Sequence, residues 1–243
     1  MGSTSNGMSP ILQVKNLNVR FDTLKVLNDL SFDVEKGNIV AIIGPNGAGK
    51  TVLFRTLLGL IPYEGKIEWQ PGVKIGYVPQ KLSVGKDLPI TVRDFLGFKN
   101  APKGELLEAL EVLGQSGHHS EHHLSHHLLD RKMGDLSGGE LQRILIAYAV
   151  VGHPDVLLFD EPTAGVDIGG EETIYSILEK LRKKSNLSIL LISHDLNVVY
   201  RYANQVLCIN KEKICYGSPK DVLNSSALEQ LYGTEVGVYH HGH

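Results

Sequence analysis

The sequence contains little cysteine, has no excess of charge of one sign and lacks a long apolar run. Its two cysteines, Cys208 and Cys215, are too few for a disulfide framework and lie in an apolar, strand-like stretch, so we expect reduced, packed thiols. The net charge of -3 gives no general attraction to a phosphate backbone, and we expect no nucleic-acid partner. The longest apolar run, residues 144–151, falls well short of the ~20 residues of a membrane-spanning helix. If the protein acts at a membrane, another chain must supply the span.

A secretion signal is also missing. Residues 1–10, MGSTSNGMSP, have no basic start, no apolar core and no cleavage pattern, which predicts a disordered polar tail. We therefore expect the chain to stay in the cytosol.

What the sequence does contain is the alternation of an α/β fold. Residues 11–35 alternate apolar and polar positions, as half-buried antiparallel strands do. Short continuous apolar runs at 39–43, 156–159 and 189–192 are typical of buried parallel strands, and helical periodicity follows at 50–60, 140–151 and 171–184. Between them, leucines at near-helical spacing predict a helical insert; after residue 194 we expect a helix, a hairpin and a helical tail over 219–231.

Residues 44–51, GPNGAGKT, match G-x-x-x-x-G-K-[ST] between a predicted buried strand and a predicted helix. Backbone N–H groups of such a turn converge on phosphates, and the helix presents its positive end to them. Lys50 is expected to contact the β and γ phosphates, and the Thr51 hydroxyl to bind Mg²⁺. The alternative, an ordinary Gly-rich turn, does not require the complete pattern. This phosphate loop consists of Gly44, Pro45, Asn46, Gly47, Ala48, Gly49, Lys50 and Thr51.

Two carboxylates follow the predicted strand at 156–159. Asp160 is placed to hold Mg²⁺ through its water shell, and Glu161 to orient or deprotonate an attacking water. Without the phosphate loop, a solvated strand end would be the better interpretation of these residues.

Residues 136–140, LSGGE, precede a long predicted helix, and we name them the signature turn. Ser137 and Glu140 fit the S-x-x-E capping box, so the simplest interpretation is a well-capped helix. A cap does not require the adjacent Gly138 and Gly139, whereas close approach of backbone to an anion does. The signature turn is therefore a candidate for binding a second phosphate.

Together these motifs resemble one family, the ATPase domains of ABC transporters, over residues 12–232. The resemblance implies a P-loop NTPase core with ATP and Mg²⁺ as ligands. It also implies a homodimer in which each ATP lies between one phosphate loop and the partner's Ser137, Gly138 and Gly139. Such a dimer closes on ATP and opens after hydrolysis.

The resemblance assigns roles to four further residues. Gln80 resembles the glutamine that contacts Mg²⁺ and the attacking water, and His194 the histidine that contacts the γ-phosphate. By itself, a His-Asp pair after a strand would more simply cap a helix. Asp167 matches an aspartate at the dimer interface, and Phe21 an aromatic that stacks on adenine, although a strand-end phenylalanine is more often a core residue.

The expected organisation follows from these assignments. The ATP-binding core spans 11–85, with the antiparallel strands, and 136–218; the helical subdomain spans 86–135, and a helix and tail span 219–243. The resemblance implies multi-span permease subunits, an extracytoplasmic metal-binding protein and a peripheral position on the cytoplasmic face of the inner membrane. A soluble ABC ATPase, which usually has a coiled-coil arm or two cassettes, and an ABC ATPase with a non-metal cargo are the alternatives.

Two features favour a metal cargo. The stretches around Gln80, the signature turn and residues 163–167 resemble the branch that serves zinc and manganese importers. Histidines also cluster at residues 118–127 with i, i+4 spacing that lets two imidazoles share one ion, and three more end the chain. Weak, reversible Zn²⁺ binding by this cluster is our hypothesis, and a solvated low-complexity stretch is the alternative. The cluster consists of His118, His119, His122, His123, His126 and His127.

Overall fold

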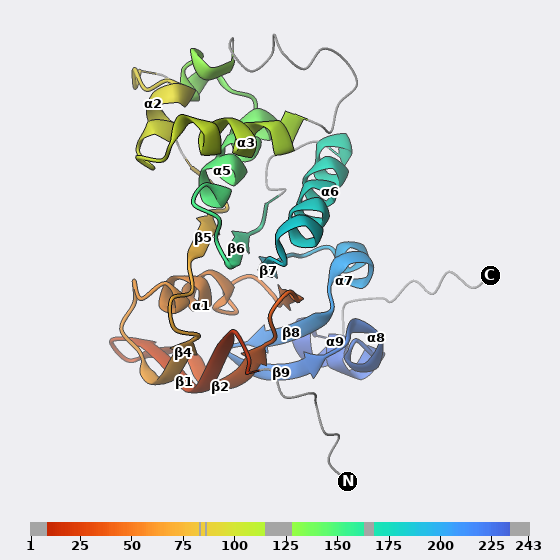
Figure 1. Cartoon of the computed structure of the whole chain (residues 1–243). Coiled ribbons are helices and arrows are strands. Elements are labelled where there is room, and N and C mark those ends of the chain that lie inside the picture. Colours follow the sequence, from red (N-terminus) through yellow and green to blue (C-terminus); the bar gives the residue numbers. More distant parts are fainter. Residues whose placement is uncertain (1–8, 83, 86, 115–127, 163–167, 234–243) are drawn as a thin grey trace, which may run out of the picture. The chain divides into compact units, whose positions relative to one another are not determined.

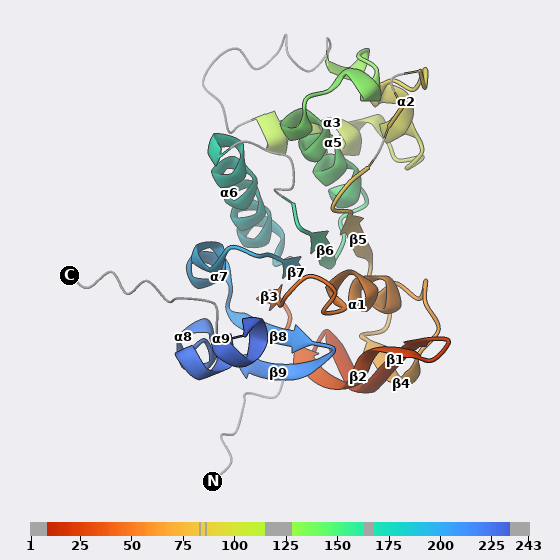
Figure 2. The same cartoon turned by 180° about the vertical axis from the view of Figure 1, so that it is seen from behind.

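The computed structural model describes residues 9–82, 84–85, 87–114, 128–162 and 168–233. The chain divides into two compact units, one of residues 1–73 and 190–243 and the other of residues 74–189. Figures 1 and 2 show the ribbon from opposite sides. Both units contain strands and helices, as the predicted α/β class requires. The finer boundaries at residues 85, 135 and 218 stay predictions.

An antiparallel sheet opens the first unit, with the strand order β2-β1-β4. Buried and exposed residues alternate along much of β1, because successive side chains of a strand point to opposite faces. The antiparallel strands predicted over residues 11–35 are thereby confirmed. The three strands are β1 (Leu12–Phe21), β2 (Leu24–Val34) and β4 (Glu64–Trp69).

A second group of strands in the first unit includes the buried strand that leads into the phosphate loop. In β3 (Ile39–Ile43) all five residues are buried, as predicted for a strand covered on both faces. β3 pairs in parallel with β8 (Gln205–Asn210), and β8 pairs antiparallel with β9 (Glu212–Gly217), which confirms the predicted hairpin. On its other side β3 neighbours β7 (Ser188–Ile192), whose first two residues belong to the second unit.

The helices of the first unit are shorter than predicted. α1 begins at Lys50 as expected but ends at Leu57, because Gly59 takes a positive φ of 73° soon after it. The predicted tail over 219–231 is two helices, since the Asn224 side chain accepts from the Ala227 N–H and starts a new one. The helices are α1 (Lys50–Leu57), α7 (Leu196–Tyr202), α8 (Pro219–Val222) and α9 (Ser225–Tyr232).

The second unit combines a parallel strand pair with helices, only some of which belong to the predicted insert. β5 (Ile75–Val78) pairs in parallel with β6 (Val156–Asp160), which is buried throughout. Among the described residues, no helix is long and apolar enough to cross a membrane. The helices are α2 (Val92–Gly97), α3 (Lys103–Gly114), α5 (Gly138–Val150) and α6 (Ile168–Ser185), with a 3-10 turn at Met133–Asp135. α2 and α3 lie in the predicted insert, and α5 and α6 correspond to the helices predicted at 140–151 and 171–184.

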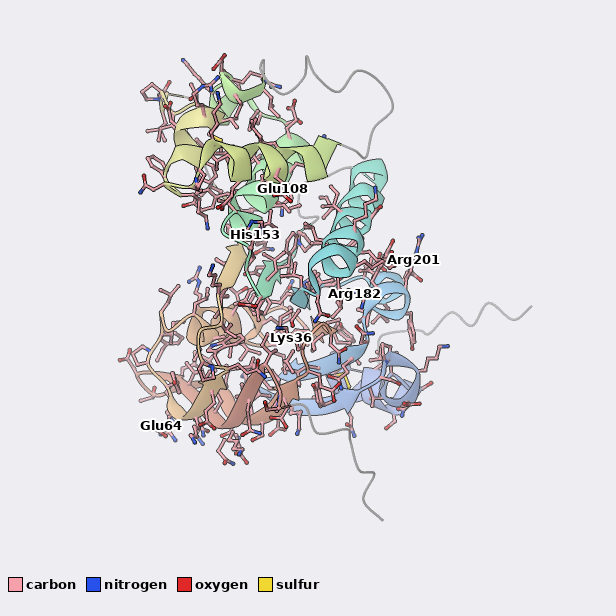
Figure 3. All side chains as sticks on the ribbon, in the orientation of Figure 1. Lys36, Glu64, Glu108, His153, Arg182 and Arg201 are labelled. Atoms are coloured by element: carbon pink, nitrogen blue, oxygen red, sulfur yellow. A yellow bond between two sulfur atoms is a disulfide. The ribbon has the colours of Figure 1, made fainter. Side chains whose placement is uncertain are left out.

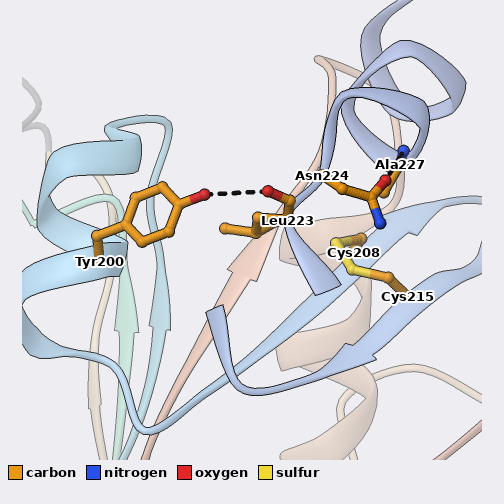
Figure 4. Close-up of a disulfide and its surroundings, with 6 residues drawn as sticks. All are labelled: Tyr200, Cys208, Cys215, Leu223, Asn224 and Ala227. Carbon is orange, nitrogen blue, oxygen red and sulfur yellow. Dashed lines mark hydrogen bonds between the residues drawn. A yellow bond between two sulfur atoms is a disulfide. The ribbon is translucent and has the colours of Figure 1, made fainter. Parts of the chain in front are cut away.

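The two cysteines are bonded to each other, so the expectation of reduced thiols is wrong. Cys208 on β8 and Cys215 on β9 are direct partners in the antiparallel register, with 4.8 Å between their Cα atoms, and they form a disulfide (Figure 4). The composition argument failed because it counted cysteines without knowing that a hairpin places these two opposite each other. The disulfide contributes to an apolar cluster that β3, β8, α7 and the C-terminal helices form.

Candidate functional site

The phosphate loop connects β3 to α1 within the first unit. Lys50 is the first residue of α1 and only 6% exposed, and its Nζ donates to the carbonyl oxygens of Gly44 (2.8 Å) and Pro45 (3.0 Å). Gly49 precedes the helix in the left-handed conformation, with φ of 95°, which glycine adopts without strain. The ammonium group and the start of the helix thus lie at one turn of backbone, the arrangement that phosphate binding needs.

The β8–β9 hairpin packs against this loop. A Cβ atom at Gly44 would collide with the carbonyl oxygen of Ile209, so the loop passes β8 at a distance that only glycine permits. The N–H of Lys211, at the hairpin turn, donates to the carbonyl oxygen of Ala48 at 3.1 Å. The loop is therefore held in shape by strand backbone as well as by its own glycines.

His194 and Phe21 belong to the same unit as the loop. His194 follows β7 and is exposed, while the next residue, Asp195, caps α7 by accepting from the Asn197 N–H at 2.7 Å. The capping interpretation of the His-Asp pair is confirmed for Asp195, and the contact of His194 with the γ-phosphate stays a prediction. Phe21 ends β1 with 46% of its side chain exposed, so it is not the core residue that strand-end phenylalanines usually are.

The second unit contains three of the predicted site residues: the catalytic candidates Gln80 and Glu161 and the Mg²⁺ candidate Asp160. Asp160 ends β6 and is 1% exposed, and Glu161 follows with a positive φ of 47°, which is uncommon for a residue with a side chain. The Gln80 Nε2 donates to Glu161 Oε2 although the two residues are 81 positions apart in the sequence. The sequence analysis did not predict this hydrogen bond, and the roles that the resemblance gives Gln80, toward Mg²⁺ and the attacking water, stay predictions.

Tyr77 is a residue of this group that the sequence analysis missed. Its hydroxyl donates to Asp160 Oδ2 at 3.4 Å from the neighbouring strand β5. The parallel register of β5 and β6 places Tyr77 opposite Leu158, close to the end of the strand. The only available signal was its position three residues before Gln80, and this signal does not identify a hydrogen-bond partner.

The donor set of the second unit fits a hard divalent cation. Asp160 supplies a carboxylate, and because the Gln80 amide nitrogen points to Glu161, its amide oxygen remains an acceptor. Carboxylate, amide and hydroxyl oxygens are the ligands that Mg²⁺ prefers, and it usually keeps several of its waters. Asp160 and Gln80 are the residues of this unit that fit Mg²⁺, and binding of the ion by Thr51 stays a prediction.

The signature turn is a capped helix start, as its sequence predicts. The Ser137 Oγ accepts from the Glu140 N–H at 3.3 Å, and Glu140 Oε2 accepts from the Ser137 N–H at 2.8 Å. Ser137 and Gly138 are nevertheless exposed, so the start of α5 is accessible to a ligand or partner. The capping box is confirmed, and phosphate binding by this turn stays a prediction.

Some predicted residues lie outside the described part of the chain. These are Asp167, the six clustered histidines and the C-terminal histidines. Among the residues that the structure does describe, no group of three or more His, Cys, Asp and Glu side chains is arranged to hold a metal ion. Zn²⁺ binding by the histidine cluster stays a hypothesis.

A pocket lies in the second unit, and none of the described residues that the sequence analysis assigned to a site lines it. Glu108 and His153, both labelled in Figure 3, contribute to its wall. The rest of the wall is mostly apolar and comes from α3, from the end of α5 and the residues that follow it up to Pro154, from α6 and from Leu187 just before β7. It therefore gives no ligand set beyond two carboxylates and one imidazole.

The motifs and the fold agree with what is known of related proteins. The family model described as "ABC transporter" matches residues 27–164. The zinc import ATP-binding protein ZnuC of Photorhabdus laumondii is 40% identical over 97% of this chain and 90% of its own length. The protein of the same name from Haemophilus influenzae is 40% identical over 96% of this chain and 86% of its own.

Solved structures show the same fold. MJ1267, an ATP-binding cassette of an ABC transporter in its ADP conformation, has a TM-score of 0.76 and 26% identity, covering 94% of this chain and 100% of its own. CbiO1 from Clostridium perfringens, part of an ABC transporter complex, has a TM-score of 0.74 and 26% identity, covering 92% of this chain and 94% of its own. The family match spans more than half of the chain, and the relatives match along nearly all of it. The chain therefore belongs to the ABC transporter family, and it is an ATPase of that family.

Proposed function

We propose that this chain is the ATP-hydrolysing subunit of a zinc importer. The observation that supports the cargo is the 40% identity, over nearly the whole chain, to proteins named zinc import ATP-binding protein. If only part of the chain matched these relatives, the identity of the cargo would stay open. The match instead covers both compact units. Manganese, another metal and a non-metal cargo are the competing outcomes of the test below.

Two groups of residues divide the work on ATP in this proposal. In the first unit, Lys50 and the backbone N–H groups of the phosphate loop bind the β and γ phosphates, and Phe21 stacks on adenine. His194 contacts the γ-phosphate. Thr51, Asp160 and Gln80 would hold Mg²⁺, which would neutralise charge on the phosphates.

Hydrolysis depends on the second group. Glu161 accepts a proton as water attacks the γ-phosphorus, the bond from phosphorus to the bridging oxygen breaks, and ADP and phosphate are the products. The hydrogen bond from Gln80 fixes the Glu161 carboxylate before the reaction, so less reorganisation is needed at the transition state.

The chain works as a dimer on membrane permease subunits, at the cytoplasmic side of the membrane. We further propose that Ser137, Gly138 and Gly139 of one subunit contact the γ-phosphate bound by the other, with Asp167 at their interface. The exposure of Ser137 and Gly138 supports this proposal. We also propose that an extracytoplasmic protein binds the metal and delivers it to the permease subunits.

The cargo is tested in cells that lack the gene for this chain. In zinc-poor medium we expect cell zinc to fall relative to the parent strain while manganese stays the same, measured by elemental mass spectrometry. Wild-type protein should restore the zinc content, and the Glu161→Gln variant should not. Glu64→Gln is the matched control, because Glu64 is an exposed carboxylate on β4 in the other unit (Figure 3). A fall in manganese alone, or no change in any metal, would contradict zinc import.

A further inference from the structure

Arg131 contacts the signature turn at both of its ends. Its Nη1 donates to Glu140 Oε1 at 2.5 Å, and its Nη2 donates to the carbonyl oxygen of Asp135 at 2.8 Å. One guanidinium group therefore ties the residue before the turn to the last residue of the turn. The fixed geometry of a guanidinium suits it to two such bonds at once.

The backbone of Arg131 is itself held in place. The Val92 N–H donates to the Arg131 carbonyl oxygen at 3.0 Å, and an isolated bridge pairs Thr91 with Lys132. Arg131 is thus anchored to the start of α2, which has its own capping box. The backbone position from which the Arg131 side chain extends to the signature turn is therefore fixed by these hydrogen bonds.

Glu140 is fully engaged between Arg131 and Ser137. Its Oε1 accepts from Arg131, and its Oε2 accepts from the Ser137 N–H and hydroxyl, each at 2.8 Å. Burial pushes the pKa of Glu140 up, but hydrogen bonds from Ser137 and from Arg131, with the positive charge of Arg131, outweigh it and leave the pKa below its usual value. Glu140 is therefore ionised at neutral pH.

An ionised carboxylate is a disadvantage where a phosphate is to bind. Glu140 lies in the first turn of α5, and Ser137 at the exposed end of that turn is the residue proposed to meet the partner's ATP. Like charges at such short range repel unless a cation compensates one of them. Arg131 forms an ion pair with Glu140.

We propose that Arg131 is a positioning residue of the partner-facing phosphate site, which it makes competent by neutralising Glu140 and by holding the Asp135 carbonyl. This inference rests on the proposed function, because it assumes that the signature turn meets ATP bound by a second subunit. It adds a charge-compensating pair, Arg131 and Glu140, to that site. Arg131 does not touch the nucleotide.

The test measures ATP-dependent dimerisation of the full-length chain in a Glu161→Gln background, where hydrolysis does not dissolve the dimer. Arg131→Gln is expected to raise the ATP concentration needed for dimerisation by about tenfold, the loss typical of a hydrogen bond to a charged group. Glu140→Gln is expected to raise it by less than about threefold, because glutamine retains the capping box and removes the charge. Arg131→Gln combined with Glu140→Gln is expected to recover most of the loss caused by Arg131→Gln, because the carboxylate charge is gone and only the bond to the Asp135 carbonyl oxygen is missing.

The control is Arg93→Gln, which removes an exposed ion pair between Arg93 Nη2 and Asp130 Oδ1, 2.7 Å long, in the same unit. ATP binding to the monomer, followed with a fluorescent ATP analogue, and the melting temperature are measured for every variant. Unchanged monomer binding with weaker dimerisation supports the inference.

Two results would overturn the inference. One is an Arg131→Gln variant that dimerises as the Arg93→Gln control does, even if its melting temperature is lower. The other is a double variant as defective as Arg131→Gln, since removing the carboxylate would then not relieve the loss of the cation. Failure of the Glu161→Gln parent itself to dimerise with ATP would overturn the proposed function and this inference with it.

Discussion

Glu161 combines an uncommon backbone conformation with a side chain that another residue holds. A positive φ of 47° is unfavourable for a residue with a Cβ, and active sites are among the places where such strained residues cluster. Gln80 donates to its carboxylate, and the adjacent Asp160 is buried at the strand end. Two adjacent carboxylates thus have different environments, which is consistent with the different roles that we propose for them.

The importance of the Gln80 contact is tested by Gln80→Ala. Without the hydrogen bond, which contributes ~1.5–3 kcal/mol when an ionised group takes part, kcat should fall by about 10- to 100-fold. The KM for ATP should change less than kcat, because Lys50 and the phosphate-loop N–H groups are the residues proposed to bind the phosphates and Gln80 is only one of the three proposed Mg²⁺ ligands. Steady-state hydrolysis at varied ATP measures both constants.

Gln70→Ala provides the comparison for this variant. Gln70 also donates through Nε2, but to the Ser9 carbonyl oxygen at 2.7 Å in the first unit. If Gln80→Ala and Gln70→Ala gave the same kcat, Gln80 would have no part in positioning the base.

At the scale of elements, the β8–β9 hairpin carries both the disulfide and a contact to the phosphate loop. The cysteines close a short loop whose turn residue, Lys211, donates to Ala48. Disulfides are rare in a reducing cytosol. The contribution of this bond to the free energy of unfolding can therefore be measured by comparing oxidising with reducing conditions.

Cys215→Ala, in oxidised protein, should lower the free energy of unfolding by about 2.5 kcal/mol, since the bond closes a loop of about eight residues. In a reducing buffer the wild type and this variant should differ by less than about 1 kcal/mol, because Cys215 is only half-buried. Urea unfolding with and without dithiothreitol measures both differences. Equal stability of the two proteins under oxidising conditions would show that the pair is not bonded in solution.

Over the whole molecule, sequence patterns correctly predicted those structural features that are determined by residues close together in the sequence. The phosphate loop, the buried strand β3 and the capping box at Ser137 each depend on a few consecutive residues. All three were predicted at the positions where the structure has them. Asn224 shows that one such signal was overlooked, because an N-cap asparagine interrupts the predicted single tail helix.

Contacts between distant positions were not predictable in the same way. The bond from Gln80 to Glu161 joins residues 81 positions apart, and only the family resemblance related them. The cysteine pair depends on the register of a hairpin, and Arg131 is separated from Glu140 by a 3-10 turn. Periodicity carries no information on which side chains meet after the chain folds.

The central claim is that this chain hydrolyses ATP with Glu161 as the base and that ATP joins two subunits. It is tested most directly by measuring, for Glu161→Gln, ATP turnover and the mass in solution with ATP by light scattering, beside wild type and the Glu64→Gln control. We predict turnover lower by about 10²- to 10⁴-fold, the usual contribution of a general base, together with a stable ATP-bound dimer. Hydrolysis at the wild-type rate, or a mass that stays that of a monomer with ATP, would contradict the account.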